Sequence, residues 1–268
     1  MKLMRMRYHP SPAAKRAALR KWYQMMAERY AEIGLWFMNY GFVETDPHAI
    51  PLSLDPADEA YRHQIQLYHH VAGAVDIRDK QVVEVGCGRG GGASFVMRYL
   101  RPQSMTGIDY ATNAIRLCKK YHSIPGLCFL VGDAEKLPFH QESFDIVLNV
   151  ESCHAYPFQD NFFAEVRRIL RFGGYFLLTD FRSPVGLDEL RRALFRSGLK
   201  MLDEKNITRN VFLSMEQENR EKLELIEKIT PPEMRQEFEE FAGTEGSPIY
   251  EGLKNGDARY VSYVLQKI

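Results

Sequence analysis

The sequence predicts an α/β protein in which helices cover both faces of a mostly parallel sheet. From Gln81 onward, short β-branched runs alternate with amphipathic helical segments, a pattern typical of a parallel sheet wrapped by helices. Apolar residues from Phe162 to Leu170 recur at i, i+1, i+4, i+7 and i+8, which gives one helix an apolar face for that sheet. The chain then closes on an alternating run. The expected strands are Gln81–Val85, Met105–Asp109, Leu127–Val131, Phe144–Val150, Tyr175–Asp180 and Tyr260–Gln266.

Helical segments outside these strands predict a cap. Residues 12–43 and 57–76 have the pattern of helices rich in aromatics, and a Glu-rich helical stretch spans 208–243. In that stretch Thr230, two prolines and Glu233 have the pattern of a capping box. Gly173 and Gly174 are expected to end the preceding helix with a left-handed cap. The predicted division is 1–76 for an N-terminal helical cap, 77–207 for the cofactor-binding core, 208–257 for a helical insertion that completes the cap, and 258–268 for the final core strand.

The composition limits the classes of function. Lys+Arg and Asp+Glu both number 35, so net charge does not favour a nucleic-acid partner, and none is expected. Seven basic residues precede the first acid, Glu28; they are interpreted as a solvated helix face, with contact to an anionic membrane surface as the alternative. The longest apolar candidate, Ile33–Val43, is too short to cross a bilayer. The N-terminus lacks a signal-peptide core, so a cytoplasmic protein is expected. The four cysteines show no metal-binding spacing, and no metal is expected.

The most informative stretch is a glycine-rich turn between the first strand and the helix that follows it. Glycines allow a sharp turn and a close approach of the backbone to a ligand, and the next helix offers unpaired N–H groups. Gly86, Gly88 and Gly91 match the dinucleotide fingerprint GxGxxG, and Asp109 lies where a ribose-binding acid is expected. By itself, the loop therefore fits either a nicotinamide cofactor or another nucleoside-containing cofactor.

Two acidic residues favour a cationic cofactor. Glu84 precedes the first glycine by two residues, where a carboxylate would repel a pyrophosphate but would suit the ammonium and sulfonium of S-adenosylmethionine. Asp133, directly after the third strand, is placed to accept a hydrogen bond from the exocyclic amine of adenine. Together with Asp109 and Glu151, these acids all fall at carboxyl ends of expected strands, where open α/β sheets bind ligands. Any one of them could equally be a turn residue or a helix cap. The ordered set is better explained by a cofactor site.

With these features the chain resembles the class I S-adenosylmethionine-dependent methyltransferases. Parts of it also resemble the phthiotriol dimycocerosate-type and related polyketide and sugar O-methyltransferases, through GGGASFVMRYL, LNVESCHAYP, FMNYGF and LYHHVA. One departure is Phe172, where the family usually has proline before the two glycines. The core resemblance rests on EVGCGRG (84–90), GID (107–109), GDAEKLPF (132–139), SFDIV (143–147) and EVRRILRFGGYFLLTD (165–180).

The resemblance implies a Rossmann-like sheet of seven strands, S-adenosyl-L-methionine as the cofactor, and O-methylation of a hydroxyl on a small secondary metabolite that is polyketide, lipid-like or glycosylated. It also implies roles for individual residues: Glu84 for the methionyl amino group, the loop glycines for close backbone approach, Asp109 for the ribose, and Asp133 with Ala134 for the adenine. The full expected cofactor set is Glu84, Gly86, Gly88, Asp109, Tyr110, Asp133, Ala134 and Asn149.

For an alcohol acceptor, a base must remove the proton, and His154 is the best candidate, four residues past Val150 at the end of a strand. In the family, a histidine after this strand often serves as the base, with an acid at the end of the next strand, here Asp180. The alternative is an ordinary loop histidine beside a strand-end cap. The aromatics Trp36, Phe37 and Tyr40, together with Tyr68, are expected to contact the acceptor, although an aromatic segment is more often simply core.

Two rival functions remain at this stage. A nicotinamide-dependent dehydrogenase is disfavoured by Glu84 and by the Gly132-Asp133-Ala134 motif. A protein that uses S-adenosylmethionine structurally, or for a rearrangement, stays open because fold does not settle chemistry. The identity of the acceptor and the oligomeric state, including a homodimer, are also left open by the sequence.

Overall fold

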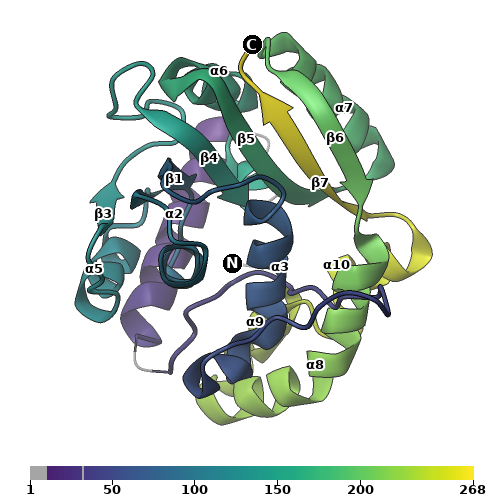
Figure 1. Ribbon diagram of the computed structural model, residues 1–268. Helices are drawn as coiled ribbons and strands as arrows, with labels where there is room; N and C mark the ends of the chain where they lie inside the picture. The colour runs from purple at the N-terminus through teal and green to yellow at the C-terminus, as the bar shows by residue number, and fades with distance from the viewer. Residues whose placement is uncertain (1–10, 32) are drawn as a thin grey trace.

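The computed structural model describes residues 11–31 and 33–268, and it contains the predicted mostly parallel sheet of seven strands (Figure 1). The strand order is β3-β2-β1-β4-β5-β7-β6, and only β7 runs antiparallel to its neighbours. The strands are β1 (Gln81–Val85), β2 (Ser104–Asp109), β3 (Leu127–Val131), β4 (Phe144–Val150), β5 (Leu170–Arg182), β6 (Lys200–Asn206) and β7 (Arg259–Gln266).

Helices cover both faces of the sheet because successive strand residues point to opposite sides. Val82 belongs to the apolar core beneath α3, α4 and α5, whereas Val83 belongs to the core beneath α6 and α7. The helices are α2 (Pro12–Arg29), α3 (Arg62–Ala72), α4 (Gly91–Phe95), α5 (Thr112–Tyr121), α6 (Gln159–Ile169), α7 (Pro184–Arg196), α8 (Thr208–Ile229), α9 (Arg235–Ala242) and α10 (Pro248–Asn255), with the short helical turns η1 (Pro56–Tyr61), η2 (Val96–Leu100), η3 (Cys153–Ala155) and η4 (Pro232–Met234).

The two predicted parts of the cap meet in space. Trp22 and Tyr30 of the N-terminal segment pack on Phe238 of α9, with ring centroids 5.6 and 4.9 Å apart. These residues form their own apolar cluster, separate from the two cores of the sheet. In Figure 1, α8, α9 and α10 gather at one end of the sheet, below the strands. The helical segments before and within the core therefore form one cap, although more than 200 residues of sequence separate Trp22 and Tyr30 from Phe238.

Several local expectations were wrong. The helix predicted over 12–43 ends at Arg29, and the described chain from 33 to 55 is irregular, with Gly34 and Gly41 at positive φ. Of the segment 57–76, only Arg62–Ala72 is α-helical. β6 did not stand out in the sequence because it is an edge strand whose side chains are mostly exposed, so the apolar alternation is missing.

Two predicted helix caps were also wrong. α6 ends at Ile169 with an extended Leu170, so Gly173, although at positive φ, lies within β5 and helps to form an irregularity there. Thr230 makes no capping hydrogen bond; its hydroxyl is buried, and no partner for it is found in the part of the chain that the structure describes. The prolines that follow start the short turn η4 instead.

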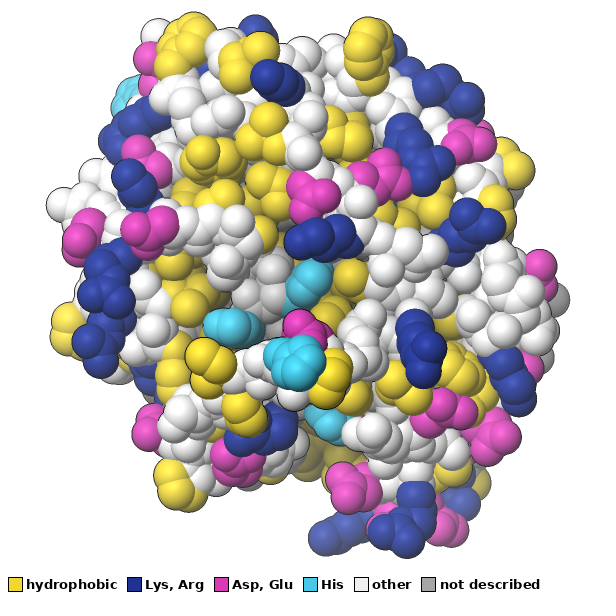
Figure 2. Space-filling model, turned by 45° about the vertical axis from the view of Figure 1, so that its right-hand side comes forward, with side chains coloured by type: hydrophobic (Ala, Val, Ile, Leu, Met, Phe, Trp, Pro, Cys, Tyr) yellow, Lys and Arg dark blue, Asp and Glu magenta, His cyan; other side chains and the backbone are white. Residues whose placement is uncertain are grey.

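The surface agrees with the balanced charge. On the face that Figure 2 shows, Lys and Arg side chains are interspersed with Asp and Glu. Across 11–31 and 33–268 no helix is long and apolar enough to span a membrane, and no group of three or more His, Cys, Asp or Glu residues could hold a metal ion.

Candidate active site

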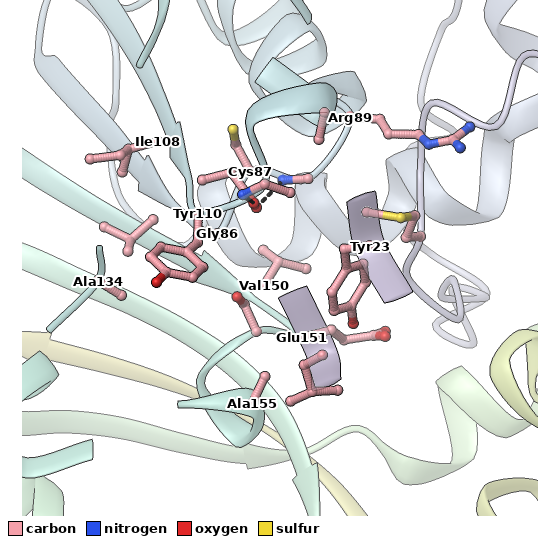
Figure 3. Close-up of a pocket in the computed structure, with 18 of the residues that line it drawn as sticks. Tyr23, Gly86, Cys87, Arg89, Ile108, Tyr110, Ala134, Val150, Glu151 and Ala155 are labelled. Carbon is pink, nitrogen blue, oxygen red and sulfur yellow. Dashed lines mark hydrogen bonds between the residues drawn. The ribbon is translucent and has the colours of Figure 1, made fainter. Parts of the chain in front are cut away.

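The glycine-rich loop after β1 is shaped by backbone that only glycine adopts easily. Gly86, Gly88 and Gly90 all have positive φ, and the amide N–H groups of Gly86 and Cys87 donate to the carbonyl of Ile108 on β2. A Cβ atom on Gly86 would lie 2.0 Å from the Ser152 Oγ, so the space there excludes any side chain. The loop thus forms a cradle of backbone at the carboxyl ends of β1 and β2, lining a pocket (Figure 3).

Asp109, at the end of β2, holds this loop in place. Its Oδ2 accepts a hydrogen bond from the Gly88 amide at 2.9 Å, and its Oδ1 accepts one from the Ala111 amide at 2.8 Å. Burial raises the pKa of this carboxyl. Each carboxylate oxygen can accept a second hydrogen bond, so the side chain is able both to fix the loop and to receive the two hydroxyls of a ribose.

Glu84 is completely buried and bonded to Tyr68, which the sequence had assigned to the acceptor. The Tyr68 hydroxyl donates to Glu84 Oε1 at 2.6 Å, whereas Glu84 Oε2 is buried and has no partner within the described residues. Burial raises the pKa of Glu84 to about 8. Tyr68 lines the pocket, whereas Glu84 is not one of the lining residues and reaches the pocket only through its hydrogen bond with Tyr68. An unpartnered buried oxygen fits a ligand that brings a cationic donor.

Three further residues expected to bind the cofactor, Tyr110, Asp133 and Ala134, also line the pocket. Figure 3 shows Tyr110 beside Ala134. Asp133 Oδ1 accepts a hydrogen bond from the Glu135 amide at 2.9 Å, which orders the turn after β3.

Asn149 has a different place. It is fully buried and is not one of the pocket-lining residues. Its side-chain amide donates to the Val85 carbonyl at 2.7 Å and accepts from the Cys153 amide at 3.1 Å. We therefore assign it to holding the ends of β1 and β4 together rather than to direct contact with a cofactor.

The N-terminal helix supplies residues that the sequence did not identify. Leu19, Arg20, Tyr23 and Ala27 of α2 line the pocket, and the Arg20 guanidinium lies 4.6 Å from the centre of the Tyr110 ring. Their spacing, i, i+1, i+4 and i+8, places them on one helix face, and this pattern is visible in the sequence. The pattern could not predict a pocket residue because nothing in the sequence says which part of the protein that face covers.

The aromatics expected to contact an acceptor are divided by the structure. Trp36 and Phe37 line the pocket, next to Gly91, whose amide donates to the Trp36 carbonyl at 3.2 Å. Tyr40 is not one of the lining residues, but its backbone amide donates to Glu151 Oε1 at 2.8 Å.

Arg89 joins the glycine loop to α2. Although it belongs to the loop, its guanidinium points away from the cofactor end and donates to the backbone carbonyls of Met26, Tyr30 and Leu35. The first two carbonyls are at the C-terminal end of α2, where helices have unsatisfied acceptors and favour cations. Arg89 is 2% exposed and caps the helix that closes the pocket.

We expect Arg89→Met to loosen α2 and to weaken cofactor binding by about 10-fold, since several charged hydrogen bonds are lost. Hydrogen exchange should show lower protection over residues 12–29, and calorimetry should show the loss of affinity. The matched control is Arg192→Met, at an exposed arginine of α7. If protection over 12–29 and affinity both stay as in the original protein, Arg89 does not hold this helix.

His154 and Asp180 are brought together as the sequence predicted. The His154 Nδ1 lies 2.8 Å from Asp180 Oδ1, and the His154 amide donates to Asp180 Oδ2 at 2.9 Å. Asp180 is fully buried and also pairs with Arg182 at 3.0 Å. Burial opposes its ionisation, but Arg182 and His154 hold the pKa of Asp180 well below its ordinary range. His154 itself is not one of the residues lining the pocket, which includes its neighbours Ser152 and Ala155.

Taken together, these residues fit S-adenosylmethionine. The cradle of Gly86 and Gly88 would be filled by any Cβ, Asp109 faces it, and Glu84 keeps an orphaned oxygen beside it. When bound, this cofactor supplies an electrophilic methyl group on a sulfonium; the chain's contribution is to bind and orient it and to exclude water with α2.

Comparison with known proteins supports this assignment. Residues 83–178 match a family model described as a methyltransferase domain. A fatty-acid O-methyltransferase of Mycolicibacterium smegmatis is 41% identical over 246 residues, covering 91% of this chain and 88% of the relative. A phthiotriol/phenolphthiotriol dimycocerosates methyltransferase of Mycobacterium tuberculosis is 40% identical over 248 residues, covering 92% and 91%.

Solved structures share the fold. The [4+2]-cyclase SpnF superposes with a TM-score of 0.69 at 19% identity, over 93% of this chain and 94% of its own. A putative sarcosine dimethylglycine methyltransferase from Galdieria sulphuraria also has a TM-score of 0.69, at 15% identity, over 91% and 98%. The pocket fits the cofactor, and the two relatives match the chain over nine-tenths of its length. The chain therefore belongs to the S-adenosylmethionine-dependent methyltransferases.

Proposed function

We propose that this methyltransferase transfers the methyl group to a hydroxyl oxygen of a small, lipid-like or polyketide acceptor. The observation that carries the proposal is the His154–Asp180 pair, hydrogen-bonded at 2.8 Å at the carboxyl ends of β4 and β5. An imidazole held by a buried carboxylate is suited to take the proton of an alcohol, with Asp180 stabilising the imidazolium that forms. The names of the two relatives, which refer to a fatty acid and to phthiotriol dimycocerosates, support a lipid-like acceptor.

When bound, S-adenosylmethionine would supply the methyl group to the acceptor oxygen and would leave as the neutral thioether S-adenosylhomocysteine. His154 would take the proton of the acceptor hydroxyl. Leu19, Tyr23 and Ala155 line the pocket and would exclude water from the reacting groups, and Figure 3 shows Tyr23 and Ala155 near Glu151. We keep Trp36 and Phe37 as proposed acceptor contacts. A cytoplasmic location and a homodimer likewise remain predictions.

A direct test compares two acceptors that share one alkyl chain. The protein is incubated with S-adenosylmethionine and either a long-chain alcohol or the matching fatty acid, and S-adenosylhomocysteine and the methylated product are followed by mass spectrometry. The proposal expects a methyl ether from the alcohol. A methyl ester from the acid alone would contradict a hydroxyl acceptor. If the protein binds the cofactor but turns over with neither compound, nor with phenolic or glycosylated alcohols, it uses the cofactor structurally or for a rearrangement.

A further inference from the structure

Glu151 is a partly buried acid with a strained backbone that lines the pocket and that the proposed mechanism does not use. It follows β4 directly and has φ 47°, in the left-handed region that non-glycine residues rarely adopt. Its backbone amide donates to the Thr179 carbonyl at 2.9 Å, which fixes it to β5. Figure 3 shows Glu151 near Val150 and Ala155, at the end of the pocket covered by Tyr23 of α2.

Only one of its two carboxyl oxygens is used within the protein. Oε1 accepts hydrogen bonds from the Tyr40 amide, at 2.8 Å, and from the Tyr260 hydroxyl. Oε2 accepts no hydrogen bond from the described residues. Tyr40 and Tyr260 therefore fix the orientation of the Glu151 side chain.

No cationic side chain pairs with Glu151 in the described ranges. The two arginines that line the pocket are engaged elsewhere, because Arg20 lies on the Tyr110 ring and Arg89 binds the carbonyls of α2. Burial raises the pKa of Glu151 to about 8, and the hydrogen bonds from Tyr260 and from the Tyr40 amide oppose this increase only in part; the charge of Asp180 adds a smaller increase. A carboxyl in this position stays mostly protonated near pH 7 unless a cation stabilises its ionised form, so a cationic ligand in the pocket would be bound by the carboxylate.

We propose that Glu151 recognises the positive charge on the sulfur of S-adenosylmethionine, so that the protein binds the methyl donor more tightly than the neutral thioether product. The cofactor has two cationic centres, and two carboxyls near the pocket each have one oxygen without a hydrogen bond from the described residues. In Glu84 that oxygen is buried, whereas Glu151 is partly exposed and lines the pocket itself. Glu84 belongs to β1 and is covered by Tyr68, whereas Glu151 follows the neighbouring strand β4 and lines the pocket itself, so Glu151 is assigned to the sulfonium. After methyl transfer this charge is gone, and the product loses that attraction. The inference is independent of the acceptor.

The test is calorimetric binding of three ligands to Glu151→Gln. S-adenosylmethionine carries the sulfonium, sinefungin has an ammonium in its place, and S-adenosylhomocysteine has a neutral sulfur. Gln keeps an oxygen that can accept from the Tyr40 amide and the Tyr260 hydroxyl, so the fold should survive. We expect about a 10-fold or larger loss of affinity for the two cationic ligands and little change for S-adenosylhomocysteine. Glu221→Gln, an exposed acid of α8, controls for the loss of one negative charge.

Three outcomes would overturn the proposal. An equal loss for all three ligands would assign Glu151 to the shared ammonium or to the fold, and the melting temperature of the variant separates these two. Unchanged affinity for every ligand would remove Glu151 from binding altogether. Glu151→Asp keeps the negative charge. If this variant loses the preference for the cationic ligands over S-adenosylhomocysteine as fully as Glu151→Gln does, the charge of Glu151 is not the cause of that preference.

Proton release gives a second readout. Near pH 7 a carboxyl whose pKa is about 8 is mostly protonated, and a nearby cation lowers that pKa, so a proton leaves when the cation binds. The groups around Glu151 are Tyr40 and Tyr260, with Asp180 and Lys222 further away. Calorimetry in buffers of different ionisation enthalpy should show more proton release with S-adenosylmethionine than with S-adenosylhomocysteine. This difference should disappear in Glu151→Gln; if it persists there, Glu151 is not its source.

Discussion

His154→Ala is expected to reduce turnover by about 10²–10⁴-fold while leaving the affinity for S-adenosylmethionine nearly unchanged. The imidazole must be neutral to accept the proton of the acceptor, so activity should fall as the pH drops through the titration of the histidine. In His154→Ala that acidic limb should be absent. The measurements are kcat as a function of pH with a hydroxyl acceptor and calorimetric binding of the cofactor.

Asp180→Asn provides the partner experiment. It should lose as much turnover as His154→Ala or less, and the double variant should lose less than the sum because the pair acts as a unit. Asp180 is also bonded to Arg182, so the substitution leaves a buried guanidinium without its carboxylate, and the melting temperature must be measured alongside. Near-native turnover in His154→Ala would show that the base is another residue or that none is needed.

Asp109→Ala and Gly88→Val should each abolish cofactor binding or weaken it by about 100-fold or more. Asp109 loses the carboxylate that fixes the Gly88 and Ala111 amides, together with its remaining capacity to bind ribose hydroxyls. Val at position 88 places a branched side chain in the cradle, where even a Cβ lies 2.4 Å from the Met38 Cε. Calorimetric titration with S-adenosylmethionine measures both effects.

A matched control separates the cradle from backbone strain. Gly246 also has positive φ, 82°, and a Cβ there meets nothing within 4 Å. Gly246→Val should therefore carry the cost of the left-handed backbone without touching the pocket, and cofactor affinity should be kept. Unchanged affinity in both Asp109→Ala and Gly88→Val would show that the cofactor does not bind at this loop.

Much of the sheet could be predicted because its signals are local. The short β-branched and apolar runs of β1, β2, β3 and β4, and the alternating run of β7, were predicted within one residue of their observed ends. The glycine turn is also local, since positive φ at Gly86 and Gly88 is needed wherever the chain bends so sharply. β6 was missed because an exposed edge strand has no apolar face to produce the pattern. The irregular chain after Arg29 was missed because its aromatics have helical spacing but make contacts that only the fold supplies.

The candidate site divides in the same way. The sequence and the family resemblance predicted the cofactor loop, Asp109, Asp133 and the pairing of His154 with Asp180. They could do so because these residues lie at or near the carboxyl ends of strands whose order the motifs reveal. What the sequence by itself determined is thus the parallel core, the line of acids at its carboxyl edge and the class of cofactor.

Only the tertiary structure decided how the site is closed and how its charges are paired. It placed Tyr68 on Glu84, Arg89 on the end of α2, and Tyr260 on Glu151. The physical reason is distance along the chain. A helix or strand pattern shows which residues share a face, but it does not show which segment packs against that face. Tyr68 is 16 residues from Glu84, and Tyr260 is 109 residues from Glu151. The burial that raises the pKa of both acids to about 8 therefore depends on segments that lie far from them along the chain.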